Sequence, residues 1–282
     1  MLTYSYAMST AFQRIGEEVG MDIIVCIKRV PDTAEAAVII DETEKGIKEE
    51  RLSFDINESD NYALEEALLI KEKVGGSVTL VSVGKKEAEE VLRMGLAKGA
   101  DTAIRLWDDK FMYSDAYATA KILATAIKDR KFDLILTGCI ATDDGYSQVG
   151  PTLAELLGIP HATLVTHVEI KDNKVKVERE LEGGLLEVVE IELPALFAIQ
   201  TGINEPRYAS IIGIKRAAQK EIQVMSLEEL GLKDEDVGEY GSKIRLKKLF
   251  IPMVEKRAEI LEGTPEEVSV KLTEILKGRG LV

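Results

Sequence analysis

Short apolar runs alternate with amphipathic stretches over the first 157 residues of this chain. The apolar runs, several rich in β-branched residues, cover residues 23–27, 77–83, 102–106 and 133–137. The stretches with apolar residues at helical spacing cover residues 61–73, 86–98, 114–128 and 148–157. Strands that alternate with helices predict an α/β fold with a doubly wound, mostly parallel sheet and helices on both faces.

The pattern changes after Leu157. Strand-like segments follow one another directly at residues 163–170, 174–181 and 185–193, with turn signals at 172–173 and 183–184. These segments predict an antiparallel addition to the sheet. The apolar run 195–200 is predicted to return to the main sheet.

We expect three regions along the chain. Residues 1–20 are predicted to be an N-terminal extension, residues 21–221 a nucleotide-binding α/β domain, and residues 222–282 an extended arm that needs a partner surface. Thr264-Pro-Glu-Glu267 combines an N-cap, a first-turn proline and a capping-box glutamate, and predicts a terminal helix over 265–277. Ser114 is predicted to cap the helix 114–128, and Asn204 to cap a further helix start.

Composition excludes several classes of protein. The formal net charge of −14 argues against non-specific nucleic-acid binding, which uses basic surfaces. No apolar run approaches the roughly 20 residues that span a bilayer. With only two cysteines and two histidines, a disulfide framework or a metal centre is not expected. We expect a cytoplasmic protein, or one held at a membrane surface through partner subunits.

The segment Gly138–Gly150 is the main candidate site, because it joins a predicted buried strand to a predicted helix. Thr142 and Ser147 offer hydroxyl groups, Gly145 allows close approach of the backbone, and the helix presents its positive end. This pattern favours a nucleotide phosphate, with an ordinary capped loop as the alternative. Asp143 and Asp144 would repel a phosphate, so we expect them to cap N–H groups or to accept from a ribose hydroxyl.

Two further segments are candidates at the same edge of the sheet. Asn57-Glu-Ser-Asp60 either caps the following helix or forms an edge of the pocket, and Lys28-Arg29 either adds positive charge there or is solvated surface. No G-x-G-x-x-G after the first strand, P-loop or Ser/His/Asp arrangement is present, and no catalytic residue is predicted.

Several motifs together resemble the beta subunit of electron transfer flavoproteins, over nearly the whole chain from Met21. They are Val25-Cys-Ile-Lys-Arg-Val-Pro-Asp-Thr33, Asn57-x-x-Asp60 with Ala63-Leu-Glu-Glu-Ala67, the 138–150 loop with Pro151 and Ala154-Glu-Leu-Leu-Gly158, Val177-Glu-Arg179, and Pro194-Ala195 with Asn204-Glu-Pro-Arg-Tyr208.

The resemblance implies a heterodimer in which the arm embraces an alpha subunit. It also implies a docking segment for partner dehydrogenases at Arg207, Tyr208 and Ile211. The nucleotide contacts that it implies are Cys26, Lys28, Asn57, Asp60, Val83, Gly84, Gly138, Ala141, Thr142, Asp143, Asp144, Gly145, Tyr146, Ser147, Gln148 and Val149.

The nucleotide differs between branches of this family. One branch holds a structural AMP, and the electron-bifurcating branch holds an FAD that takes a hydride from NADH. This beta-subunit FAD sends electrons along two paths. One path leads to ferredoxin or flavodoxin, and the other leads through the alpha-subunit FAD to a dehydrogenase or quinone pathway. Val30-Pro-Asp-Thr33 and Gln148-Val-Gly-Pro151 resemble the bifurcating branch, which favours FAD with AMP as the alternative. Asp143-Asp-Gly-Tyr146 stands where Asp-Gly-Asp-Thr is usual. Such a subunit is active only with its alpha subunit.

Overall fold

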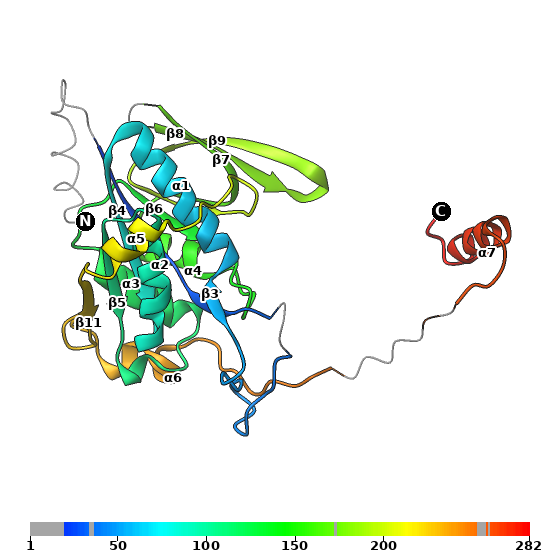
Figure 1. Ribbon diagram of the computed structural model, residues 1–282, viewed down its shortest axis with the longest axis horizontal. Helices are drawn as coiled ribbons and strands as arrows, with labels where there is room; N and C mark the ends of the chain where they lie inside the picture. The colour runs from blue at the N-terminus through cyan, green and yellow to red at the C-terminus, as the bar shows by residue number, and fades with distance from the viewer. Residues whose placement is uncertain (1–19, 34–36, 172–173, 253–257, 259) are drawn as a thin grey trace, which may run out of the picture.

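A mostly parallel sheet forms the centre of the molecule (Figure 1). The structure is a computed structural model that describes residues 20–33, 37–171, 174–252, 258 and 260–282. Within these residues, nine strands form one sheet in the order β11-β5-β4-β1-β6-β10-β7-β8-β9. The strands are β1 (Met21–Cys26), β4 (Gly76–Val83), β5 (Thr102–Leu106), β6 (Leu134–Gly138), β7 (His161–Lys171), β8 (Lys174–Leu181), β9 (Leu185–Glu192), β10 (Ala195–Ile199) and β11 (Ile222–Met225). The predicted α/β fold is confirmed.

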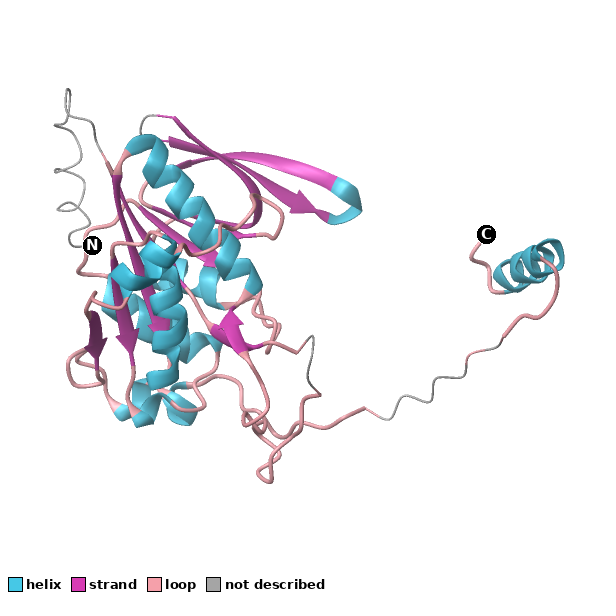
Figure 2. Cartoon of the chain, viewed as in Figure 1, coloured by secondary structure: helices cyan, strands magenta, loops and turns pink. Residues whose placement is uncertain are grey.

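Helices cover both faces of the parallel part of the sheet (Figure 2). α1 (Glu58–Val74), α2 (Glu89–Lys98) and α5 (Ile211–Ala217) contribute to one core cluster, and α3 (Ala116–Ile127) and α4 (Val149–Leu157) to the other. Short elements complete the fold: β2 (Arg29–Pro31) paired with β3 (Phe54–Ile56), the 3₁₀ turns η1 (Lys86–Ala88), η2 (Asp109–Phe111), η3 (Glu182–Gly184) and η4 (Asp234–Asp236), and helices α6 (Gly238–Gly241) and α7 (Pro265–Gly278).

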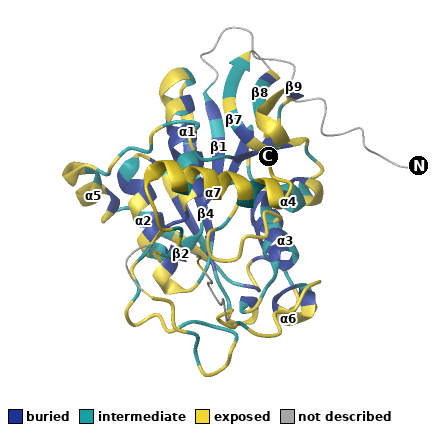
Figure 3. Cartoon of the chain, turned by 90° about the vertical axis from the view of Figure 1, so that its right-hand side faces the viewer, coloured by how far each residue is buried: buried dark blue, intermediate teal, exposed yellow. Residues whose placement is uncertain are grey.

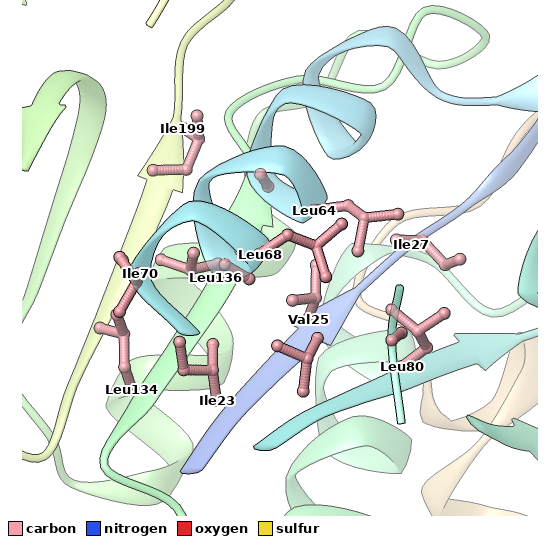
Figure 4. Packing of buried hydrophobic residues seen from close by; sticks show 14 of the residues in the cluster. Ile23, Val25, Ile27, Leu64, Leu68, Ile70, Leu80, Leu134, Leu136 and Ile199 are labelled. Carbon is pink, nitrogen blue, oxygen red and sulfur yellow. The ribbon is translucent and has the colours of Figure 1, made fainter. Parts of the chain in front are cut away.

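The alternation of side chains along β1 explains how apolar residues are buried on both faces of the sheet. Ile23 and Val25 point into the core under α1, where they meet Leu64 and Leu68 (Figure 4). Ile24 belongs to the opposite core under α3 and α4. Because successive strand residues point to opposite faces, an uninterrupted apolar run is the pattern that a buried parallel strand needs.

The antiparallel addition and the returning strand are also confirmed. β7, β8 and β9 pair antiparallel in succession, while β10 lies parallel between β6 and β7. The predicted turn at 172–173 and the predicted extension 1–20, apart from its last residue, lie outside the described residues.

The chain leaves the sheet later than the expected boundary at residue 222. β11 pairs with β5, and Leu227, Leu230 and Val237 are buried in the core beneath it. Among the described residues, the extended arm therefore consists of residues 243–252 (Figure 1). α7 carries the predicted capping box between Thr264 and Glu267. It has no buried residue (Figure 3).

Two predicted helix caps are wrong. Asp115 caps α3 by accepting from the backbone N–H of Ala118, whereas the hydroxyl of Ser114 accepts from Gly238 N. No helix begins at Asn204, since α5 starts at Ile211 with Ser210 as its N-cap. The capping role falls to the next residue, Asp115, in the first case and to Ser210, six residues further on, in the second. Among the described residues, no helix is long and apolar enough to cross a membrane.

Candidate functional site

A cleft of about 940 Å³ opens at the carboxyl ends of β1, β4 and β6. The chain runs outward from β1 to β4 and β5 on one side, and β6 then pairs with the other side of β1. A reversal of this kind is the topological switch point at which open α/β sheets bind ligands. The topology therefore places the cleft where a ligand site is expected.

We call the strand ends and the loop after β6 the inner wall of the cleft, formed by residues 26–28, Asp60 and the segment 138–150. Most of the sequence-predicted nucleotide contacts line the cleft: Cys26, Lys28, Asp60, Val83, Gly84, Gly138, Ala141, Asp143, Asp144, Tyr146, Ser147, Gln148 and Val149. Asn57, Thr142 and Gly145 are not among the lining residues.

Asp60 ties the ends of two strands together beneath the cleft. Its carboxylate accepts from the backbone N–H of Lys28 (2.7 Å) and of Gly138 (2.9 Å). Burial raises the pKa of Asp60 to about 7, although both backbone donors oppose that shift. A Cβ atom at position 138 would lie 2.4 Å from Asp60 Oδ1, so this junction accommodates only glycine without rearrangement.

Asn57 holds the loop rather than capping α1. It occupies the N-cap position, but its side chain makes no capping hydrogen bond. Instead, Asn57 Nδ2 donates to Ile140 O (2.8 Å), and Asn57 Oδ1 accepts from Thr142 N (3.0 Å). The capping interpretation offered by the sequence is therefore wrong for Asn57, which instead holds the loop that borders the cleft.

Lys28 and the two aspartates of the loop form a local ion cluster. Lys28 Nζ donates to Asp143 Oδ1 (2.7 Å) and to Asp144 Oδ2 (2.8 Å). Burial alone would lower the pKa of Lys28, but the two carboxylates outweigh it and raise the pKa above its ordinary value. The repulsion that two carboxylates would exert on a phosphate is thus partly offset by this ammonium group.

The N-terminus of α4 faces the cleft with its N–H groups unused by a side-chain cap. Gln148, at the N-cap position, makes no capping hydrogen bond among the described residues, and the first turn holds no acidic residue. Ser147 and Gly145 take left-handed backbone conformations, with φ of 55° and 66°. Gly150 lets the helix approach β6, because a Cβ there would lie 2.8 Å from Thr137 Oγ1. Such an end is suited to an anion.

The opposite side of the cleft, which we call the outer wall, was not predicted. It consists of aromatic residues after β5 and of two segments far apart in the sequence: Trp107, Phe111 and Tyr113, the 45–49 region (Lys45, Gly46, Ile47 and Glu49), and residues 244–246 with Leu249. The arm meets the 45–49 region through a hydrogen bond from Leu249 N to Glu44 O (2.6 Å). Trp107 could have been found from the sequence, since it directly follows a strand that ends at the same edge.

The cysteines at the cleft are buried and neutral. Burial raises the pKa of Cys26 and of Cys139. The Cys139 thiol donates to Gln200 Oε1 (3.3 Å). No group of three or more potential metal ligands occurs among the described residues, and both histidines lie on the surface.

Of the three predicted docking residues, Arg207 is bound by other side chains of this chain, whereas Tyr208 and Ile211 are exposed. Arg207 is engaged by Glu65 and Glu72 of α1. Tyr208 and Ile211 are 97% and 75% exposed. Ile211 is the first residue of α5 and Tyr208 lies three residues before it; α5 packs on the face of the sheet opposite α3 and α4 (Figures 1 and 3).

Comparison with known proteins identifies the family. The electron transfer flavoprotein domain matches residues 45–230. The beta subunit of the electron transfer flavoprotein from Methylophilus methylotrophus is 42% identical over 91% of this chain and 98% of its own length. This chain belongs to the electron transfer flavoprotein beta-subunit family.

Two other relatives carry more specific names. CarD, a subunit of the caffeyl-CoA reductase-Etf complex of Acetobacterium woodii, is 38% identical over 93% of this chain and all of its own length. Protein FixA of Azotobacter vinelandii is 36% identical over 86% of this chain and 89% of its own length. As a member of this family, the chain is an electron transfer protein, and the α/β fold around the cleft is the one expected of it.

Proposed function

We propose that this electron transfer flavoprotein subunit holds FAD in the cleft, with the diphosphate against the inner wall. The observation that carries the proposal is the helix end at α4, which joins left-handed backbone at Gly145 and Ser147 to N–H groups without a side-chain cap. The cleft of about 940 Å³ is near the upper end of the range of about 300–1,000 Å³ for small-molecule sites, which favours a dinucleotide over a mononucleotide.

The residues present fit such a group in three respects. Gly138 and Gly150 let the end of β6 and the start of α4 pack closely against Asp60 and Thr137, Asn57 fixes the loop, and Lys28 offers a cation close to where a phosphate would lie. The outer wall adds Trp107 and Phe111, which form an edge-to-face aromatic pair beside the cleft. An aromatic surface of this kind suits a planar ring.

A bound FAD would supply hydride chemistry, since its ring can take two electrons and one proton from NADH and can release the electrons singly. The two electron paths would lead to ferredoxin or flavodoxin and, through the alpha-subunit flavin, to a dehydrogenase or quinone pathway. This chain's own residues bind and orient the cofactor and exclude water; no side chain of the inner wall is assigned a catalytic role.

We further propose that the arm and α7 bind the alpha subunit. Val270 and Leu272 of α7, and Phe250 and Ile251 of the arm, are exposed apolar side chains. An amphipathic helix without a buried face needs a partner to be stable. Tyr208 and Ile211 would contact a partner dehydrogenase. The name of the CarD relative, a subunit of a caffeyl-CoA reductase-Etf complex, is in line with such a partner. A cytoplasmic location, or a peripheral one through partner subunits, belongs to this proposal.

The test is a count of flavins in the heterodimer obtained by co-expression with the alpha subunit. The nucleotides are extracted with acid and separated by chromatography, and flavin is quantified against subunit concentration. Two FAD per heterodimer support the proposal. One FAD with one AMP would assign the cleft to a structural AMP, and the chain would then be a simple electron-carrier subunit.

A further inference from the structure

Arg207 is held by two carboxylates of α1 through both edges of its guanidinium group. Arg207 Nη2 donates to Glu65 Oε1 (2.8 Å), and Arg207 Nη1 donates to Glu72 Oε1 (2.5 Å). The backbone N–H of Arg207 also donates to Glu65 Oε2 (3.0 Å). Glu65 is only 4% exposed. Forked, charge-assisted contacts of this kind fix orientation as well as position.

The rest of the segment is anchored at several other points. Asn204 Nδ2 donates to Tyr62 O (3.1 Å) and to Glu66 Oε2 (3.0 Å). A Cβ at Gly213 would lie 2.2 Å from Ala97 O, so α5 lies directly against α2. Arg93 Nη1 donates to Ala217 O (2.9 Å) at the end of α5. The segment 204–217 is therefore held on α1 and α2 from end to end.

The outer surface of this anchored segment is apolar. Tyr208, Ile211, Ile212 and Ile214 are all exposed, Tyr208 almost completely. Lys215 and Arg216 follow in the last turn of α5, and neither forms an ion pair among the described residues. An exposed apolar cluster beside free cations suits a partner that has an apolar pocket with an acidic rim.

Arg207 is unavailable to that partner, because its guanidinium group is already bound by Glu65 and Glu72. We propose that Arg207 is a positioning residue that presents Tyr208, Ile211, Ile212 and Ile214 to the redox partner in a preformed arrangement. This inference rests on the proposed docking function of the segment. The partner is a redox enzyme that acts on an acyl-CoA substrate, the chemistry of the caffeyl-CoA reductase in the name of the CarD relative. An ordered docking surface loses less conformational entropy on binding, so the clamp contributes to affinity without contacting the partner.

The experiment uses the full heterodimer, with an acyl-CoA dehydrogenase and its acyl-CoA substrate as the electron source. Removal of Arg207 alone would leave the buried Glu65 charge unpaired and could unfold the region. The main variant is therefore the double substitution Glu65→Gln with Arg207→Gln, which removes both charges. Glu72→Gln loosens only the exposed half of the clamp. Lys73→Gln is the matched control, since Lys73 is an exposed cation on the same helix without an ion pair among the described residues.

We expect the double variant to raise the dehydrogenase KM for the heterodimer about tenfold, with kcat and flavin content unchanged; a tenfold change corresponds to about 1.4 kcal/mol. Glu72→Gln should raise this KM less, and Lys73→Gln should leave it unchanged. Hydrogen exchange should become faster over residues 204–212 in the double variant only. A KM equal to that of the unaltered heterodimer despite faster exchange would overturn the inference, as would an equal loss of kcat and of flavin.

A separate variant distinguishes this inference from the docking function on which it rests. Ile211→Asp places a charge in the apolar cluster and leaves the clamp intact. If Ile211→Asp raises the KM and the double variant does not, only the positioning role of Arg207 fails. If Ile211→Asp leaves the KM unchanged, the segment is not the docking surface, and the docking part of the proposed function fails as well.

Discussion

The inner and outer walls of the cleft are built in different ways. The inner wall is made of strand ends tied together by Asp60 and a loop held by Asn57. The outer wall brings the 45–49 region close to α6 and the arm, about 200 residues away, through the ion pair of Lys45 with Glu239 of α6 and the hydrogen bond from Leu249 N of the arm to Glu44 O. The first wall is fixed by the core of the sheet. In the second wall, the 45–49 region and the arm are joined by contacts between segments that lie outside both core clusters.

The largest expected effect comes from filling the junction that joins β6 to Asp60. Gly138→Ala would place a Cβ 2.4 Å from Asp60 Oδ1 and 2.7 Å from Ser59 Cβ. Overpacking of this kind costs about 1–3 kcal/mol. We expect a fall in the free energy of unfolding at the upper end of that range, together with loss of bound flavin. Thermal unfolding and flavin content measure the two effects.

Gly278→Ala is the matched control for that substitution. Gly278 lies in α7, and nothing lies within 4 Å of the position that its Cβ would take. This control should unfold like the unaltered protein and keep its flavin. If Gly138→Ala kept both stability and flavin, the inner wall would be as adjustable as the outer wall, and the contrast between them would disappear.

Asp60 should make the inner wall sensitive to pH. Because the pKa of Asp60 is raised to about 7 in the folded protein, the folded state binds more protons than the unfolded state between about pH 4 and pH 7. The contribution of Asp60 to stability therefore falls as the pH rises through this window, by at most about 1.4 kcal/mol per pH unit.

Denaturant unfolding of the unaltered protein and of Asp60→Asn at several pH values checks this expectation. The difference in the free energy of unfolding between the two should change across pH 4–7 and level off above it. Carboxylates whose pKa is lowered, such as Asp115, have the opposite slope but contribute equally to both proteins. A difference that stays constant with pH would mean that Asp60 is ionised throughout and that its burial is not decisive.

The outer wall should affect the ligand more than the fold. Leu246 and Leu249 line the cleft from the arm, whereas Lys247 between them is not among its lining residues. We expect Leu246→Ala with Leu249→Ala to weaken flavin retention several-fold, since about 1.4 kcal/mol of lost apolar contact is tenfold in affinity. Dialysis of the heterodimer followed by flavin fluorescence measures retention.

Lys247→Ala is the control for the arm, since Lys247 is exposed and does not line the cleft, and it should leave flavin retention unchanged. The sheet itself should unfold at the same temperature in all three proteins, because these side chains lie outside both core clusters. If the Leu246 and Leu249 substitutions lowered the unfolding temperature and left retention intact, the arm would belong to the fold and not to the binding site.

The inner wall of the cleft could be predicted from the sequence, and the outer wall could not. β5 was predicted at its observed bounds, and the inner wall was found, because apolar runs, glycines and their spacing are local signals. The outer wall was missed because its parts come from three distant stretches of the chain, which only the tertiary fold brings together. The boundary at residue 222 was misplaced because Ile222–Met225 is a short, half-exposed edge strand, and its pairing with β5 leaves little trace in composition.

Side-chain partners were the least predictable part of the site. Asn57 in an N-cap position normally caps its own helix, and only the fold shows that its amide instead binds the backbone of Ile140 and Thr142. Arg207 was expected at a partner interface, yet Glu65 and Glu72 of the same chain bind it. A polar side chain with several possible partners takes the one that tertiary structure brings into reach.

Asp144 tests the smallest difference between the walls, since it lies at the exposed end of the inner wall. The Lys28–Asp144 pair is partly exposed, so its loss should change the free energy of unfolding by no more than about 0.5 kcal/mol. Asp144→Asn keeps an acceptor for Tyr146 N and removes one negative charge near the proposed phosphate position. We expect flavin affinity to rise about two- to threefold at low ionic strength, with the gain lost in high salt.

Asp234→Asn, which breaks the exposed pair with Lys110 outside the cleft, should have no effect on affinity. Weaker flavin binding in Asp144→Asn would mean that this carboxylate orients Lys28 toward the ligand, so that even the exposed end of the inner wall is fixed in place.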